Sequence, residues 1–262
     1  MDKLSIIPDY NDIAESLRLS REYEAQFEYN DFFVPDVLVD PEQCKKIIQF
    51  YGSLKRQECG RDTMHGAFFD TTINSADPEI RRISVLRFRQ SMDVAGALGA
   101  KAVVFHTNYI ANFHSRRYHK QWLDAYEEFL CKLLEEYPGM MIYMENMFDE
   151  EPYLLAELAG RLKDVPRFGV CLDVAHANIG KAPMEEWFAS LAPYICHLHV
   201  NDNDGIEDAH LPVGTGKIDW GEYDALVRKH RISPTVLVEN NGCKAQEESI
   251  RYMKEHRIYP WG

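Results

Sequence analysis

The sequence of 262 residues has little positive charge and lacks any long hydrophobic run. Its 29 Lys and Arg residues are outnumbered by 42 Asp and Glu residues, which gives a formal net charge of −13. Non-specific binding to nucleic acid or to an anionic membrane surface depends on basic side chains that neutralise phosphates, so nucleic acid is an unlikely partner on composition. No run approaches the roughly 18 apolar residues of a membrane span, and we expect no membrane association.

Paired cysteine motifs and a secretion signal are also missing. The cysteines are scattered without a C-x-x-C pair, which in a long chain indicates reduced thiols and not a disulfide framework; they are Cys44, Cys59, Cys131, Cys171, Cys196 and Cys243. The first residues, MDKLSIIPDYND, contain neither a long apolar segment nor a small-residue cleavage site. We therefore expect a soluble, cytoplasmic protein.

Short apolar runs alternate with helical patterns along the chain. The strand-like runs lie at residues 3–10, 25–30, 62–69, 101–109, 140–146, 167–177, 194–202 and 235–240. Each is followed by a helix-like segment, and several of these segments open with Pro or Asp. Eight strand–helix units in about 250 residues are typical of a (β/α)8 TIM barrel, so we expect residues 1–262 to form a single α/β domain of this kind. The alternative, an open doubly wound sheet, usually has a glycine-rich turn after its first strand; here that strand ends in IIPDYND.

Metal-capable side chains stand at the ends of six consecutive predicted strands. In TIM barrels the catalytic residues come from the C-terminal strand ends. The side chains are His65, His106, Glu145, Asp173 with His176 shortly after it, His197 with His199, and Glu239. Residues two apart share a strand face, and His197 sits one pleat deeper than His199, so we expect a supporting or core role for His197.

Each of these residues has an ordinary structural interpretation when taken alone. A single His after an apolar run is often a hydrogen-bonded core residue, and a single Asp or Glu at a strand end is often a helix cap. Several carboxylates that converge at a barrel mouth cost several kcal/mol unless they are paired or metal-bound. Mixed His and carboxylate ligands suit zinc or manganese, with cobalt or iron also possible, better than calcium.

The loop after the seventh strand adds Asp208 and His210, which as an Asp-x-His pair can reach one ion. We expect Asp202 and Asp204 in the same loop to form turns and face solvent. GTGK at 214–217 does not have the spacing of a phosphate-binding P-loop. Its glycines are expected to permit backbone turns and close approach to a ligand.

Possible substrate contacts follow the third and fourth strands. Phe68, Phe69, Tyr109 and Phe113 are candidates to wall a pocket, although some of them are expected in the core. The segment HSRRYHKQW at 114–122 places basic residues at a helix start, where they favour a phosphate or carboxylate. A solvated, charge-rich helix start is the alternative.

Five motifs together resemble the xylose-isomerase-like TIM barrel superfamily, which includes sugar isomerases and epimerases and the endonuclease IV type of abasic-site nuclease (AP endonuclease family 2). The motifs are MEN at 144–146, CLDVAHA at 171–177, HLHVND at 197–202, DAHLPVGTGKIDW at 208–220 and VEN at 238–240. They are specific for the superfamily and much less so for any one member.

Resemblance to the isomerases and epimerases implies one metal ion held by Glu145, Asp173, His199 and Glu239. The metal would grip adjacent substrate oxygens and stabilise an enediolate. The two glutamates would exchange a proton with the substrate, and His176 would contact a substrate oxygen. Substrate-binding residues expected around this centre are His65, His106, Phe68, Tyr109, Arg116 and Lys217.

Resemblance to the nucleases implies three zinc ions, with additional ligands that match His65, His106, His176, Asp208 and His210. Glu145 would then bridge two ions. The chain departs from the pattern of both groups of enzymes. Well-studied ketose 3-epimerases have an Arg where this chain has Gly205, and the loop after the second strand, EYNDFFVPDVLVD, offers no Arg for insertion into DNA. Duplex DNA is therefore an unlikely substrate.

The sequence thus predicts a metal-dependent sugar or sugar-phosphate isomerase or epimerase that acts on a small molecule. The alternative is a zinc-dependent hydrolase of a small phosphodiester or, with less support, of abasic DNA. A second alternative is a barrel that binds a sugar-like ligand without turnover. Aromatic-rich loops give a faint indication of a homodimer.

Overall fold

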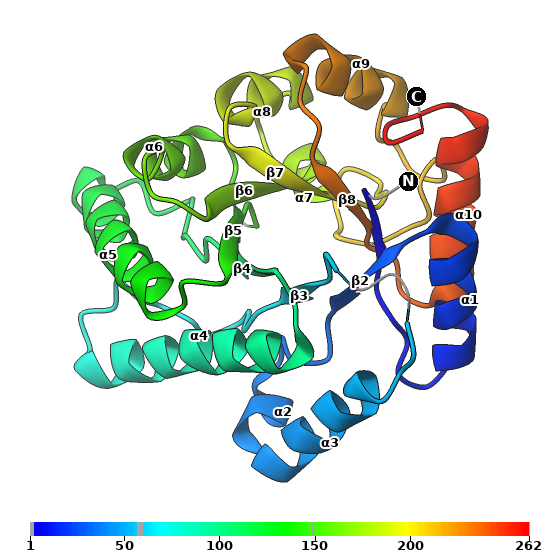
Figure 1. The fold of residues 1–262 in the computed structure, drawn as a ribbon. Coiled ribbons are helices and arrows are strands. Elements are labelled where there is room, and N and C mark those ends of the chain that lie inside the picture. Colours follow the sequence, from blue (N-terminus) through cyan, green and yellow to red (C-terminus); the bar gives the residue numbers. More distant parts are fainter. Residues whose placement is uncertain (1–2, 57–59, 148, 262) are drawn as a thin grey trace.

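A closed barrel of eight parallel strands forms the centre of the computed structural model, which describes residues 3–56, 60–147 and 149–261 (Figure 1). The strands pair in chain order and β1 closes the barrel against β8. They are β1 (Leu4–Ile6), β2 (Gln26–Tyr29), β3 (Thr63–His65), β4 (Ala102–His106), β5 (Met141–Glu145), β6 (Phe168–Asp173), β7 (Ile195–Val200) and β8 (Thr235–Val238). The predicted TIM barrel is confirmed, with each strand shorter than its apolar run.

Helices surround the barrel in an outer ring (Figure 1). Those expected from the sequence are α1 (Ile13–Tyr23), α3 (Pro41–Gly52), α4 (Pro78–Leu98), α5 (Arg116–Glu136), α6 (Tyr153–Arg161), α8 (Met184–Leu191), α9 (Trp220–His230) and α10 (Cys243–Glu255). Two short helices were not expected, α2 (Pro35–Val39) and α7 (Val174–Ile179). Within the described part of the chain, no helix is both long and apolar enough to cross a membrane.

Local chemistry explains where several helices begin. The side chains of Asp40, Asp77, Ser115 and Asp219 each accept a hydrogen bond from a backbone N–H in the first turn of α3, α4, α5 and α9. Such caps satisfy donors that have no partner within the helix. Proline occupies the first position of α3 and α4, where its missing N–H costs nothing.

The barrel interior changes from apolar to polar along the strands. Ala102 and Val104 on β4 pack with Tyr143 on β5 and Cys171 on β6 in a small buried cluster. Because side chains alternate across a strand, the next inward residue of β4 is His106. The apolar cluster is therefore a floor below the polar strand ends. The five described cysteines are free, as expected, and Cys59 lies outside the described residues.

Asp202 corrects one expectation, because it is fully buried and does not face solvent. Its carboxylate accepts hydrogen bonds from the backbone N–H groups of Asn203, Gly214 and Ile218 and from the indole N–H of Trp220. It therefore ties both ends of the loop between β7 and α9 together. Asp204 is exposed and caps a turn as predicted.

The glycines of this loop serve packing within the protein. Gly214 has a φ of +87°, and an added Cβ would collide with the ring of Tyr252. A Cβ on Gly216 would collide with the backbone oxygen of Asn203. The close approach expected toward a ligand is thus an approach to neighbouring protein atoms, which fixes the path of the loop.

Asp202→Ala should lower the free energy of unfolding by about 3 kcal/mol, because it leaves several buried N–H donors without an acceptor. Asp204→Ala is the matched control, since it removes a solvent-exposed acceptor from the same loop and should cost less than about 1 kcal/mol. Urea denaturation of both variants measures the difference. Equal losses would contradict the anchoring role of Asp202.

Candidate metal centre

Side chains from four neighbouring strand ends meet in one buried group at the barrel mouth. Ligand atoms of Glu145, Asp173, His199 and Glu239 all lie within 4.8 Å of one another. The sheet register explains this, because Asp173 on β6 is paired with His199 on β7. The four residues come from β5, β6, β7 and the residue after β8, in the order predicted.

A second group shares Glu145 with the first. Ligand atoms of His65, His106 and Glu145 lie within 4.8 Å of one another, and His106 is paired with Glu145 across β4 and β5. Glu145 Oε2 lies 3.0 Å from His106 Nε2, whereas its Oε1 lies 3.2 Å from His199 Nδ1. The two oxygens of one carboxylate thus face two different groups.

A third group joins α7 to the loop after β7. Asp208 Oδ2 lies 3.4 Å from His176 Nε2 and 3.2 Å from His210 Nε2. His176 is buried, and Asp208 and His210 are partly exposed. The Asp-x-His pair therefore contacts the histidine of the CLDVAHA motif.

Backbone carbonyls orient three of these imidazole rings. The Nδ1 atoms of His65, His176 and His210 lie 2.8–3.0 Å from the carbonyl oxygens of Gly66, Asn146 and Glu239. A carbonyl can only accept, so each Nδ1 carries the hydrogen and a neutral ring presents its Nε2 lone pair to the site. This arrangement is typical of histidines that bind metal ions.

Two asparagines that follow the site glutamates hold the surrounding backbone. Asn146 exchanges two hydrogen bonds with the backbone of Asp173, at 3.0 and 2.8 Å. The Asn240 amide donates to the carbonyl oxygens of His210 and Leu211, at 2.9 and 2.8 Å. In both MEN and VEN, the Glu thus supplies a carboxylate to the site and the Asn holds the backbone of a neighbouring segment in place.

The site contains more buried negative charge than its neighbours neutralise. Both Glu145 oxygens, Asp173 Oδ2 and Glu239 Oε2 are buried without an aligned hydrogen-bond partner. Burial raises the pKa of Asp173 to about 7, opposed by His176. Burial alone would lower the pKa of His199, yet Cys171 and the carboxylates of Glu145 and Glu239 raise it well above its usual value. Orphaned carboxylate oxygens and inward imidazole nitrogens fit a divalent cation with mixed nitrogen and oxygen ligands.

A cavity of about 280 Å³ lies over these groups. Phe33, Phe68 and Phe69 supply aromatic walls, and Asn30 and Asn241 add polar atoms. Phe68 is therefore at the cavity, as predicted. Among the residues that the structure describes, no Lys or Arg lines it.

Three predicted substrate contacts do not reach this cavity. Tyr109 stacks on Tyr118, with ring centroids 5.0 Å apart, and lines a neighbouring hollow. Arg116 begins α5 in the outer ring and is exposed. Lys217 is exposed on the loop that Asp202 anchors. The sequence predicted the segments in which these residues lie, but not whether their side chains reach the cavity.

Glu28 on β2 is a site neighbour that the sequence reading missed. It is fully buried, with Oε1 at 3.1 Å from His199 Nε2 and Oε2 at 3.2 Å from His197 Nε2. Its position in QFEY, between the apolar Phe27 and Tyr29, was an available signal, because a carboxylate inside an apolar strand needs a partner. His197 lies behind His199, as predicted.

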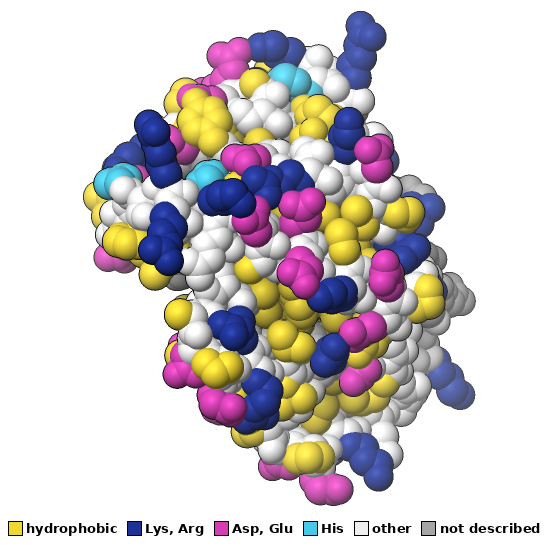
Figure 2. Space-filling model, turned by 90° about the vertical axis from the view of Figure 1, so that its left-hand side faces the viewer, with side chains coloured by type: hydrophobic (Ala, Val, Ile, Leu, Met, Phe, Trp, Pro, Cys, Tyr) yellow, Lys and Arg dark blue, Asp and Glu magenta, His cyan; other side chains and the backbone are white. Residues whose placement is uncertain are grey.

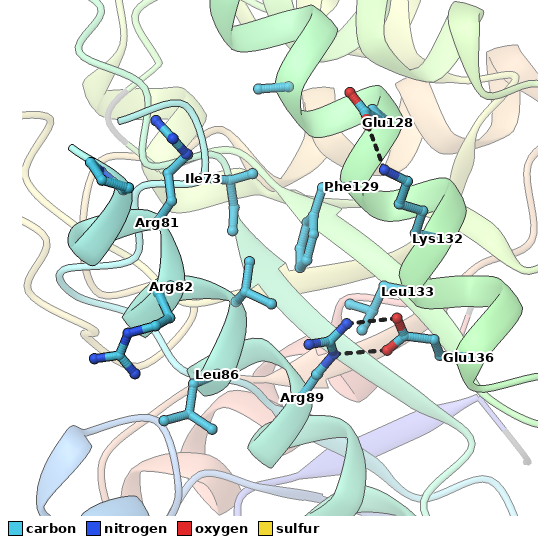
Figure 3. A pocket seen from close by; sticks show the side chains of 13 residues that line it. Ile73, Arg81, Arg82, Leu86, Arg89, Glu128, Phe129, Lys132, Leu133 and Glu136 are labelled. Carbon is cyan, nitrogen blue, oxygen red and sulfur yellow. Dashed lines mark hydrogen bonds and ion pairs between the residues drawn. The ribbon is translucent and has the colours of Figure 1, made fainter. Parts of the chain in front are cut away.

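A larger hollow of about 630 Å³ lies outside the barrel, between α4 and α5 (Figure 3). Two ion pairs lie within its lining, Arg89 with Glu136 at 2.7 Å and Lys132 with Glu128. Figure 2 shows that the side of the molecule where α5 lies carries interspersed basic and acidic side chains. This hollow contains none of the buried His and carboxylate groups described above, so the barrel mouth is the candidate site.

Comparison with known proteins agrees with this architecture. An uncharacterized protein of Methanocaldococcus jannaschii, MJ1311, is 28% identical over 74% of this chain and 69% of its own length. A probable endonuclease 4 of Protochlamydia amoebophila is 27% identical over 47% of this chain and 48% of its own.

Two solved structures show the same fold at 23% identity. One is a D-tagatose 3-epimerase-like protein, with a TM-score of 0.71 over 97% of this chain and 96% of that one. The other is the TTHB071 protein of Thermus thermophilus soaked with ZnCl2, with a TM-score of 0.74 over 97% of both chains. Residues 24–256 match the family described as xylose isomerase-like TIM barrel. The chain therefore belongs to the xylose isomerase-like TIM barrel family.

Proposed function

We propose that the protein is a metal-dependent hydrolase of small phosphodiesters whose centre binds three divalent cations, with zinc as the best candidate. The observation that carries this proposal is that two further groups of possible ligands lie beside the four-residue group. A mononuclear isomerase needs Glu145, Asp173, His199 and Glu239. It has no need for a separate group of His65 and His106, nor for Asp208 placed between His176 and His210.

The chain's own residues would hold the cations at fixed positions. Glu145 offers one oxygen to the side of His106 and the other to the side of His199, so it is the natural bridge between two sites. Asp208 offers one oxygen to both histidines of the third group. Bound cations would supply a water of lowered pKa and neutralise charge on the phosphoryl oxygens.

The cavity favours a small substrate over duplex DNA. Its volume of about 280 Å³ and its walls of Phe33, Phe68 and Phe69 suit a compact group that is shielded from water. With no Lys or Arg among the described lining residues, the cations themselves must balance a phosphate charge. The net charge of −13 opposes a long polyanion. Similarity to a probable endonuclease 4 supports the reaction class.

A second candidate, a sugar or sugar-phosphate isomerase or epimerase, is favoured by a different observation. Glu145 Oε1 and Glu239 Oε2 lie 3.2 and 3.3 Å from the same atom, His199 Nδ1. An enzyme that removes a substrate proton with one carboxylate and returns it with another needs both carboxylates beside the same point. Similarity of fold to a D-tagatose 3-epimerase-like protein is consistent with this candidate.

Zinc content should distinguish the two candidates. We expect about three zinc ions per chain by elemental analysis after purification without chelator, as the three groups of ligands imply. Asp208→Asn should lose one ion, because Asp208 joins the third group. His119→Gln, at a partly exposed histidine on α5 that pairs with Glu157, is the control and should keep all three. One ion per chain, unaffected by Asp208→Asn, would exclude the trinuclear centre.

Hydrolysis of bis(p-nitrophenyl) phosphate should be detectable by release of p-nitrophenol and should stop after chelation. Asp208→Asn should lower kcat/KM by more than about 100-fold, since even residues behind a metal ligand typically contribute 10–100-fold. Restoration of activity by added zinc is the control for chelator damage. An inactive wild-type protein with full metal content would argue against the hydrolase.

Solvent exchange provides the test of the second candidate. If Glu145 and Glu239 transfer substrate protons, incubation with ketoses in deuterium oxide should place deuterium on a sugar carbon, as detected by mass spectrometry. Glu239→Gln should abolish the exchange. Absence of exchange across neutral and phosphorylated ketoses would leave the isomerase without support.

A further inference from the structure

We propose that Glu28 is the positioning residue that fixes which nitrogen of His199 faces the metal centre. The inference rests on the proposed metal centre, but it concerns a residue that does not contact a metal itself. Glu28 lies on β2, beneath the ligand groups, and neither its backbone nor its carboxylate reaches the cavity surface.

His199 differs from the other histidines of the centre. His65, His176 and His210 direct Nε2 inward, because a backbone carbonyl holds each Nδ1. His199 has the opposite orientation: its Nδ1 faces Glu145 and Glu239, and its Nε2 points down toward the barrel interior. A carboxylate oxygen of Glu28 lies 3.1 Å from that Nε2, and the thiol of Cys171 is also near His199.

The donors around Glu28 define the hydrogen positions. The Thr63 hydroxyl donates to Oε2 at 2.5 Å. His197 presents Nε2 to the same oxygen at 3.2 Å, with its Nδ1 2.6 Å from the Thr235 hydroxyl. An ionised carboxylate only accepts, so its charge favours the ring forms of His197 and His199 that carry hydrogen on Nε2.

This assignment leaves the His199 Nδ1 lone pair directed at the centre. The contacts of Glu28 with the two rings are at ion-pair distance and are not aligned hydrogen bonds in this structure. The carboxylate therefore acts through its charge, which favours the ring form with hydrogen on Nε2. The alternative form would place a ring lone pair 3.1 Å from a negatively charged carboxylate oxygen. A carboxylate behind a metal-binding histidine also raises the basicity of the ligand nitrogen.

Burial explains why a charged residue is used. No water can hydrate Glu28, which is fully buried, so an ionised state depends on the donors around it. Thr63 and His197 thus keep the carboxylate in place beneath His199.

Glu28→Gln tests this role without reference to catalysis. It preserves shape but replaces the charge with an amide, whose N–H₂ group can donate to His199 Nε2 and so favour the wrong ring form. We expect the affinity for zinc alone, measured by competition with a chromophoric chelator, to fall about 10–100-fold. Two-bond ¹H–¹⁵N spectra of histidine-labelled protein should show His199 with hydrogen on Nε2 in the wild type and a changed pattern in the variant.

Asp62→Asn is the matched control. Asp62 is also a buried carboxylate, but it pairs with Arg56 and accepts from Tyr29 and the backbone of Phe27. It should lose stability in urea denaturation while zinc affinity and the His199 spectrum stay unchanged. If Glu28→Gln does not fold, Thr63→Val removes one donor to Glu28 and should weaken zinc binding by a smaller factor.

Each outcome has a distinct meaning. A wild-type protein that binds no zinc overturns both the metal centre and the role of Glu28. Wild-type affinity in a folded Glu28→Gln, or hydrogen on Nδ1 of His199 in the zinc-loaded wild type, overturns the role of Glu28 alone. Equal loss of affinity in Asp62→Asn would show that Glu28 acts through general stability.

Discussion

Uncompensated negative charge at the barrel mouth is the constraint on which the rest of the site depends. Glu145, Asp173 and Glu239 converge there with orphaned oxygens, and Glu28 adds a further buried carboxylate beneath them. Such a group is stable only with protons or cations in its midst. The imidazoles of His65, His176 and His210 are arranged for cations, because a backbone carbonyl accepts from each Nδ1 and each Nε2 is left to the site.

The scaffold supports that charge by fixing backbone as much as side chains. Strand register sets His106 beside Glu145 and Asp173 beside His199. Asn146 and Asn240 then brace the neighbouring segments, and Asp202 closes the loop that presents Asp208 and His210. A loop tied at both ends can keep a partly exposed ligand pair in position, which a free surface loop would not.

Much of the site could be predicted because parallel strands all end at one edge of the barrel. The residues at the ends of the apolar runs include the members of both groups that share Glu145, namely His65, His106, Glu145, Asp173, His199 and Glu239. Glu28 was not predicted as a site residue because it lies within a strand and not at its end. Asp202 was misjudged because an Asp near glycines resembles a turn former, and only the fold shows that four N–H groups converge on it. Arg116 and Lys217 are exposed and do not line the cavity, because the packing that places side chains of long connections is not encoded in their spacing.

The third ligand group carries the most information about reaction class. His176 has one nitrogen committed to the Asn146 carbonyl, so its remaining nitrogen can serve either a cation or a substrate oxygen. That nitrogen lies within 3.4 Å of Asp208, an anion, and Asp208 in turn lies beside His210. A carboxylate between two imidazole nitrogens would compete with a neutral substrate hydroxyl for both rings, whereas a cation is attracted to all three groups at once. The placement of Asp208 therefore favours a metal-binding role for His176 over a substrate contact, and with it the hydrolase over the isomerase.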